Sequence, residues 1–256
     1  MSDHPHDRRS PLREGILRQA GQSTDERYQD LWDEVVQYLV LAFFMVAIAL
    51  FGFLPRPSSP WIIAGMAMVG CAFCVKKMRP LLQEMKDYRL GRDGEKTVAQ
   101  HLDVLRENGT KILHDLPGDG FNIDHVLVCP KGIFTIETKT VRKPRGEDPK
   151  MAYNGQKLTI NGIPLPDDPL PQARGQTRWL IDLLRKETGR AFAVTPVVVF
   201  PGWWIEKKHN GAEVWVLNDK ALPAFLAGAP DKLSPEDVAL VYSRLSDRDR
   251  TPNAGE

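Results

Sequence analysis

The chain has 256 residues, and its 34 lysines and arginines nearly balance its 33 aspartates and glutamates. The resulting net charge of +1 excludes a histone-like protein that holds nucleic acid by bulk positive charge. A composition of 42% hydrophobic and 26% charged residues excludes a disordered or collagen-like chain. The three cysteines, an odd number, argue against a disulfide framework and favour a reducing compartment.

The strongly apolar sequence is concentrated in one block, which predicts a transmembrane helical hairpin. Residues 35–54 run without a charge over 20 positions, the length that a helix needs to cross a hydrocarbon core. A second apolar run over residues 60–76 follows a proline-rich turn. Because this run is short for a span, we expect it to thin the bilayer, to begin within the turn, or to lean on the first helix. Small residues in it, such as Gly65 and Gly70, permit close helix packing.

Two other structures produce apolar runs, and the sequence argues against both. More than 30 mostly polar residues precede the first run, which a signal peptide does not have. An unbroken run of this length is also rare in a buried hairpin of a soluble core. Basic residues flank both outer ends of the hairpin, while the turn holds only Arg56, so both termini are predicted to face the cytoplasm. We therefore expect a multi-pass protein of the cell (inner) membrane, with the lipid bilayer as a partner.

The rest of the chain alternates helical and strand patterns, which predicts an α/β domain over residues 90–246. The expected organisation is a cytoplasmic segment over residues 1–34, the hairpin over residues 35–76, a linker over residues 77–89, this domain, and a flexible tail over residues 247–256.

Within the α/β domain, hydrophobic periodicity and turn residues predict the elements in chain order. They are a helix over 93–108, strands over 111–116, 122–128 and 133–141, a hairpin over 155–163, a helix over 171–188, strands over 193–200 and 213–217, and a helix over 235–245. Asn161-Gly162 is the turn signal of the hairpin. Ser234 is the expected N-cap of the last helix.

The informative chemistry lies on the two strands after residue 121. Residues two apart in a strand share a face, so Glu137 and Lys139 point the same way. Asp124 can lie opposite Glu137 only if Val128 pairs with Ile133, which makes residues 129–132 a four-residue connection. A three-residue connection would instead turn Asp124 to the wrong face.

In the first register, oxygen ligands converge on one point. Asp124, Glu137 and the backbone carbonyl of Thr138 would suit Mg²⁺ or Mn²⁺, which prefer carboxylate, carbonyl and water ligands. Lys139 would lie beside the metal-bound water, and Glu95 on the first helix of the domain could add a carboxylate. The set fits metal-assisted hydrolysis of a phosphodiester.

These residues, in this order, resemble the PD-(D/E)xK nuclease superfamily and, more narrowly, its nuclease-related domain (NERD) family. The segments GEKTVAQHL, NIDHVLVCPKGIFTIETKT and DPLPQARGQ match the successive motifs of that family. The resemblance covers roughly residues 90–200. It implies a restriction-endonuclease-like α/β fold, a mixed sheet flanked by helices, and a metal-dependent role in DNA processing.

The resemblance also implies roles for individual residues. The implied catalytic residues are Glu95, Asp124, Glu137, Lys139 and Gln172. Gln172 resembles the family's helix glutamine, but Asp168-Pro169 stands where the family usually has Asn-Pro. Gln176, one helical turn later, is the alternative glutamine.

Other readings of the same residues stay open. Glu137 and Lys139 could form a surface ion pair, and Glu95 could only stabilise a helix N-terminus. His125 lies on the strand face opposite Asp124, so a core histidine is expected rather than a general base. Trp203-Trp204 could stack on bases, rest at the membrane interface or pack in the core, and core packing is expected. Arg142, Lys143 and Arg145 could contact a nucleic-acid backbone or form a solvated loop.

Two functions follow from these patterns. The first is a membrane-anchored, Mg²⁺- or Mn²⁺-dependent nuclease that hydrolyses DNA, or RNA, on the cytoplasmic side. The alternative is a catalytically inactive nuclease-like module that binds nucleic acid or a protein partner at the membrane. The sequence fixes no oligomeric state.

Overall fold

The computed structural model describes residues 17–51, 60–107, 109–143, 149–207 and 211–250. The chain divides into two compact units. One unit is helical and runs from Gly21 to Lys96, while the other takes in the chain up to Ala20 and from Thr97 onward and contains the sheets. Helix α2 belongs to both units because it continues through residue 96.

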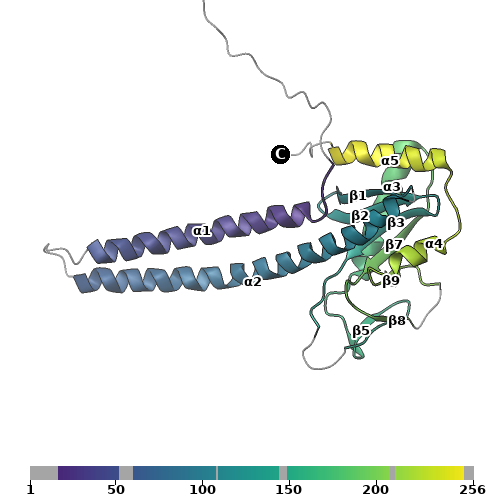
Figure 1. The fold of residues 1–256 in the computed structure, drawn as a ribbon. Helices are drawn as coiled ribbons and strands as arrows, with labels where there is room; N and C mark the ends of the chain where they lie inside the picture. The colour runs from purple at the N-terminus through teal and green to yellow at the C-terminus, as the bar shows by residue number, and fades with distance from the viewer. Residues whose placement is uncertain (1–16, 52–59, 108, 144–148, 208–210, 251–256) are drawn as a thin grey trace, which may run out of the picture. The chain divides into compact units, whose positions relative to one another are not determined.

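The helical unit is built from two long helices that lie side by side, α1 (Gln22–Phe51) and α2 (Pro60–Arg106) (Figure 1). Both are long and apolar enough to cross a membrane, and only 6% of each apolar window is buried. The core helix of a soluble protein would be mostly buried, whereas here Phe43 and Val69 are 69% and 72% exposed. By their length and composition, the two apolar helices suggest membrane association.

Residues 77–89, which we expected to form a linker, are helical and continue α2. This stretch consists mainly of good helix formers such as lysine, leucine, glutamine and methionine, and the internal Pro80 does not end the helix. Leu31 and Val35 of α1 pack here against Met85 of α2 in a small buried cluster.

The close approach of the two helices at Gly70 gives a testable prediction. A Cβ atom at Gly70 would overlap the Sδ atom of Met45 on α1, whereas a Cβ at Gly65 would meet nothing within 4 Å. Because the methionine side chain can move aside, we expect Gly70→Ile to destabilise the helical unit by only about 1 kcal/mol. Thermal unfolding in detergent measures the effect. Gly65→Ile is the matched control, and an equal loss in both variants would contradict the packing at Gly70.

The second unit contains a mixed five-stranded sheet with the strand order β1-β2-β3-β7-β9. Its strands are β1 (Lys111–Pro117), β2 (Asn122–Cys129), β3 (Gly132–Thr138), β7 (Val194–Val199) and β9 (Trp215–Leu217). The first three are antiparallel neighbours, and β3, β7 and β9 run parallel. A parallel neighbour requires a crossover, and the chain between β3 and β7 contains helix α3 (Leu170–Thr188).

Helices cover both faces of this sheet, as its continuous apolar strands require. On one face, α3 and α5 (Pro235–Arg250) pack against residues such as Val126 and Ile133. On the other face, the end of α2 and α4 (Leu222–Ala227) pack against residues such as Leu127 and Phe134. Residues on β3 therefore alternate between a face covered by α3 and a face covered by α2 and α4.

A second, four-stranded sheet has the order β6-β5-β4-β8. Its strands are β4 (Met151–Tyr153), β5 (Leu158–Ile160), β6 (Ile163–Pro164) and β8 (Ile205–Lys207). The predicted turn at Asn161-Gly162 joins β5 to β6, with φ angles of 50° and 83°. The sequence patterns did not predict β4, β8 or α4, which are short. The predicted strand over residues 133–141 ends earlier, at Thr138.

The last helix has the predicted N-cap, since Ser234 Oγ accepts a hydrogen bond from the backbone N–H of Asp237 at 3.2 Å. The helix extends beyond its expected end at Leu245, to Arg250, and Ser246 and Asp249 are buried. The remainder of the expected tail, residues 251–256, lies outside the described residues.

Candidate active site

The β2–β3 hairpin has the register that the site requires. Val128 pairs with Ile133, as predicted, and the ladder continues to Cys129 and Gly132, so that Pro130-Lys131 forms a tight turn. This register turns Asp124 to the face of Glu137. The Asp124 carboxylate accepts a hydrogen bond from the backbone N–H of Thr138, with 2.6 Å between Oδ2 and N. Asp124 is therefore held beside the residue that follows Glu137.

Glu137 is a buried carboxylate near the end of β3, with 6% of its surface exposed. Its Oε2 accepts a hydrogen bond from Nε2 of Gln176 on α3 at 2.8 Å. The same Gln176 nitrogen also donates to the carbonyl oxygen of Asn122 on β2 at 3.1 Å. Next to this contact, the hydroxyls of Thr135 and Thr177 lie 2.6 Å apart and join β3 to α3. Helix α3 thus fixes the Glu137 side chain through Gln176.

Burial raises the pKa of Glu137 to about 7. The hydrogen bond from Gln176 and the positive charge of Lys139 lower this pKa, whereas the negative charge of Asp167 raises it further. Burial is the largest influence, so the charged form of Glu137 is poorly stabilised by the protein alone.

Lys139 lies just beyond the end of β3 and is partly exposed. Its ammonium group forms an ion pair with the exposed carboxylate of Asp167, in the segment before α3. Its backbone N–H donates to the carbonyl oxygen of Val199 on β7 at 2.9 Å, which continues the β3–β7 pairing. Sequence reasoning missed Asp167. The acidic pair Asp167-Asp168 in an irregular segment gives no periodic signal, and only its closeness to α3 could have suggested it.

The structure distinguishes the two candidate glutamines of α3. Gln172 is exposed, and the contact with Glu137 is made by Gln176, the alternative one turn later. Asp168, which stands where the family pattern has asparagine, accepts a hydrogen bond from the backbone N–H of Leu170 at 3.0 Å. The aspartate therefore still serves the start of the helix.

The donors of this site suit a hard divalent cation. Asp124 and Glu137 provide carboxylate oxygens, and Oε1 of Gln176 is buried without a hydrogen-bond partner among the described residues. No cluster of three or more histidine, cysteine, aspartate or glutamate side chains arranged for metal binding occurs in the described part of the chain. A cation here would thus have two side-chain carboxylates and need further oxygen ligands, such as the Thr138 carbonyl and water.

The comparison with protein families decides the identity of this region. Residues 90–201 match the family described as nuclease-related domain, NERD. The match spans 112 of the 256 residues, and this segment is similar to that family. The match includes Asp124, Glu137, Lys139 and Gln176, and it leaves most of the two long helices outside. No curated protein and no solved structure matches the chain.

Glu95, at the start of the NERD match, belongs to the helical unit. Its carboxylate accepts a hydrogen bond from the hydroxyl of Thr24 on α1, with 3.0 Å between the oxygens. The predicted catalytic role of Glu95 stays a prediction.

The three basic residues after the ExK strand are described only in part. Arg142 and Lys143 are exposed, and Arg145 lies outside the described residues. The Lys143 ammonium lies 5.4 Å from the centre of the Trp203 ring, within the range of a cation–π interaction.

His125 is the core histidine that the sequence predicted, on the face of β2 opposite Asp124. Its Nδ1 lies 2.9 Å from Nδ1 of His114, whose Nε2 lies 3.1 Å from Nη2 of Arg106. Because arginine only donates, His114 accepts at Nε2 and donates from Nδ1 to His125. Burial lowers the pKa of both histidines, which favours these neutral tautomers.

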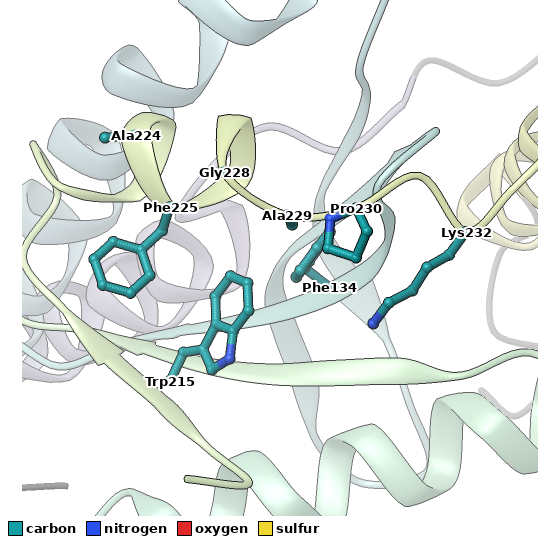
Figure 2. Close-up of a pocket in the computed structure, with 8 residues that line it drawn as sticks. All are labelled: Phe134, Trp215, Ala224, Phe225, Gly228, Ala229, Pro230 and Lys232. Carbon is teal, nitrogen blue, oxygen red and sulfur yellow. The ribbon is translucent and has the colours of Figure 1, made fainter. Parts of the chain in front are cut away.

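The unit that contains the sheets also has an aromatic cavity of about 550 Å³, most of whose lining residues lie beyond the NERD match (Figure 2). Phe134, Trp215 and Phe225 line it, with neighbouring ring centres 5.5 and 5.8 Å apart, and Lys232 lies at its edge. Phe134 and Glu137 project from opposite faces of β3, because they are three residues apart. The cavity and the carboxylate site are therefore separated by the sheet.

Proposed function

We propose that the protein is a membrane-anchored, metal-dependent nuclease with a restriction-endonuclease-like fold. The observation that carries the proposal is the convergence of two carboxylates at one end of β3. Glu137 is buried and held by Gln176, and Asp124 is docked on the next backbone N–H, that of Thr138. A NERD domain suggests a nuclease-related function, and this arrangement supports metal-assisted hydrolysis of a phosphodiester bond.

Each residue of the site has a proposed part in that chemistry. Asp124, Glu137 and the Thr138 carbonyl would hold Mg²⁺ or Mn²⁺, which would polarise the phosphate and promote ionisation of a bound water. Lys139 is partly exposed and follows Glu137 by two residues. It would orient the attacking water or stabilise negative charge on the phosphate. Gln176 takes the supporting role that was predicted for Gln172, because its hydrogen bond orients Glu137. Glu95 remains a proposed further acid.

The proposed substrate is DNA, with RNA as the alternative. The exposed Arg142 and Lys143, together with Arg145, follow the ExK strand directly in the sequence. Basic side chains at that place would contact the phosphate backbone and position it for cleavage without reading its sequence.

The proposed location is the cell (inner) membrane. The exposed apolar surfaces of α1 and α2 support two spans over residues 35–54 and 60–76, and the basic flanks support cytoplasmic termini. The NERD domain would then act on nucleic acid at the cytoplasmic surface of the bilayer.

The experiment that tests the proposal is a cleavage assay with the full chain in nanodiscs, on single- and double-stranded DNA and on RNA. We expect cleavage with Mg²⁺ or Mn²⁺, none with EDTA, and a loss in Lys139→Ala. Folded protein that neither cleaves any substrate nor binds metal by calorimetry would overturn the enzyme and leave the inactive binding module.

Gln176→Ala is expected to lower kcat by about 10- to 100-fold, as for other residues that orient a metal ligand. The reason is that Glu137 loses the hydrogen bond that the Gln176 side chain on α3 donates to it. Gln172→Ala, on the exposed side of the same helix, is the matched control and should retain nearly full activity. Single-turnover cleavage rates compare the two variants. A larger loss in Gln172→Ala would favour the exposed glutamine as the functional one, and equal losses would contradict a role that depends on the contact with Glu137.

A further inference from the structure

Trp204 is an exposed aromatic residue that is not packed in the core between the sheet and the helices. Its side chain is 78% exposed, the largest value among the exposed large hydrophobic residues of the described chain, the membrane-type helices included. Burial of an aromatic ring of this size stabilises a fold substantially, and that stabilisation is absent while the ring remains in water. Its neighbour Trp203 is 2% exposed and packs in the core, so the two tryptophans have different environments.

The backbone that carries Trp204 is firmly anchored. Trp203 donates a hydrogen bond from Nε1 to the carbonyl oxygen of Val141 at 3.0 Å, and its backbone N–H donates to the carbonyl oxygen of Phe200 at 3.3 Å. Gly202 allows the turn with a φ of 73°. Its N–H donates to Oδ1 of the buried Asp219 at 3.3 Å. The exposed indole is thus presented from a fixed turn.

This turn lies at the same end of the sheet as the carboxylates. β3 and β7 run parallel with Thr138 opposite Val199, so the end of β3 that carries Glu137 adjoins the end of β7 from which the turn begins. Val141, which accepts the hydrogen bond from Trp203, is only two residues beyond Lys139. Two extended residues span about 7 Å. The turn is therefore bonded to the chain that leaves the site.

A positive charge accompanies the turn. Lys143 is exposed, and its ammonium group lies 5.4 Å from the centre of the Trp203 ring. This contact is with the buried ring of Trp203, so the cation is held on the turn that also carries the exposed Trp204. Proteins hold single-stranded nucleic acid with exposed rings that stack on bases and with cations that contact phosphate.

We propose that Trp204 is the stacking platform for an unpaired base of the nucleic acid whose backbone enters the Asp124–Glu137 site. The proposal rests on the proposed nuclease function and adds a substrate class, single-stranded or frayed nucleic acid. Bases inside a duplex already stack on one another and offer no free face. Stacking also tolerates any base, so the platform gives strand selectivity without sequence selectivity.

The test measures binding and cleavage by the full chain in nanodiscs. Binding of a fluorescent single-stranded oligonucleotide is followed in the Glu137→Gln background, where cleavage is expected to be about 100-fold slower or more. KM and kcat are measured with Glu137 intact. Trp204→Ala should bind about 10-fold more weakly and raise KM with little change in kcat. Trp204→Phe should restore most of the binding. Ile163→Ala, which removes another exposed hydrophobic side chain, 69% exposed on β6, should bind as the parent does.

The substrate provides a second control. On an oligonucleotide with abasic positions, Trp204→Ala and its parent should bind equally, because no base is available to stack. Equal binding of the intact single strand by Trp204→Ala and its parent would overturn the inference while leaving the nuclease in place. Absence of any binding or cleavage by the parent would instead remove the proposed function, and the inference with it. Quenching of Trp204 emission by brominated lipids, with unchanged DNA binding in Trp204→Ala, would assign the ring to the membrane interface and overturn the platform.

Discussion

Replacement of Glu137 by glutamine is expected to reduce metal-dependent cleavage by about 100-fold or more, because a neutral amide is a poor ligand for a hard divalent cation. Glutamine keeps the size of the side chain and can still accept the hydrogen bond from Gln176, so the fold should be preserved. The loss should therefore appear in kcat with unchanged secondary structure. Initial rates with Mg²⁺ and with Mn²⁺, together with circular dichroism, measure both properties.

Two further variants make this result specific. Asp124→Asn should show a loss of similar size, because Asp124 is the other carboxylate docked at the end of β3. Glu206→Gln removes an exposed carboxylate on β8 and should retain full activity. Near-normal cleavage by Glu137→Gln would show that this carboxylate does not participate, whatever the other variants do.

The central part of this site could be predicted from the sequence because strand geometry is strict. Asp124 lies directly opposite Glu137 in one register only, and a slip by one residue would turn it to the other face. Pro130 and Gly132 allow the turn that sets this register. The burial of both faces of the sheet was harder to predict from the sequence. The residues of β3 that face α3 are Ile133, Thr135 and Glu137, and the polar ones are satisfied by partners far along the chain.

The parts that the sequence did not predict depend on tertiary contacts. Choosing between Gln172 and Gln176 required the rotation of α3 about its axis, which the packing of its apolar side onto the sheet decides. Asp167 is joined to Lys139 across 28 positions of the chain, and no local pattern encodes such a pair. Core packing was expected for both Trp203 and Trp204. Trp203 is buried as expected, whereas Trp204 is exposed. The two tryptophans lie between the turn at Gly202 and β8, where Trp203 faces the core and Trp204 faces outward.

The same Glu137→Gln substitution is expected to stabilise the metal-free protein at high pH. Burial raises the folded-state pKa of Glu137 to about 7, above its ordinary value of 4.5, so between these pH values the folded chain binds more protons than the unfolded chain. Stability therefore falls as the pH rises through this window, and glutamine removes that loss. The shift corresponds to about 3 kcal/mol in favour of the variant above pH 7, and the advantage should vanish below pH 4.5.

Unfolding of both proteins in EDTA at pH 5 and pH 8 measures this difference, with Glu206→Gln as the control that should follow the parent at either pH. Mg²⁺ should then raise the melting temperature of the parent more than that of Glu137→Gln, because a cation bound only to the folded state stabilises it. A pH-independent gain in the variant would mean that packing, and not the buried charge, limits stability at this position. The other outcome is that the stability advantage of the variant grows with pH and disappears when Mg²⁺ stabilises the parent. It would identify Glu137 as a carboxylate that stays buried for its ligand at the expense of stability.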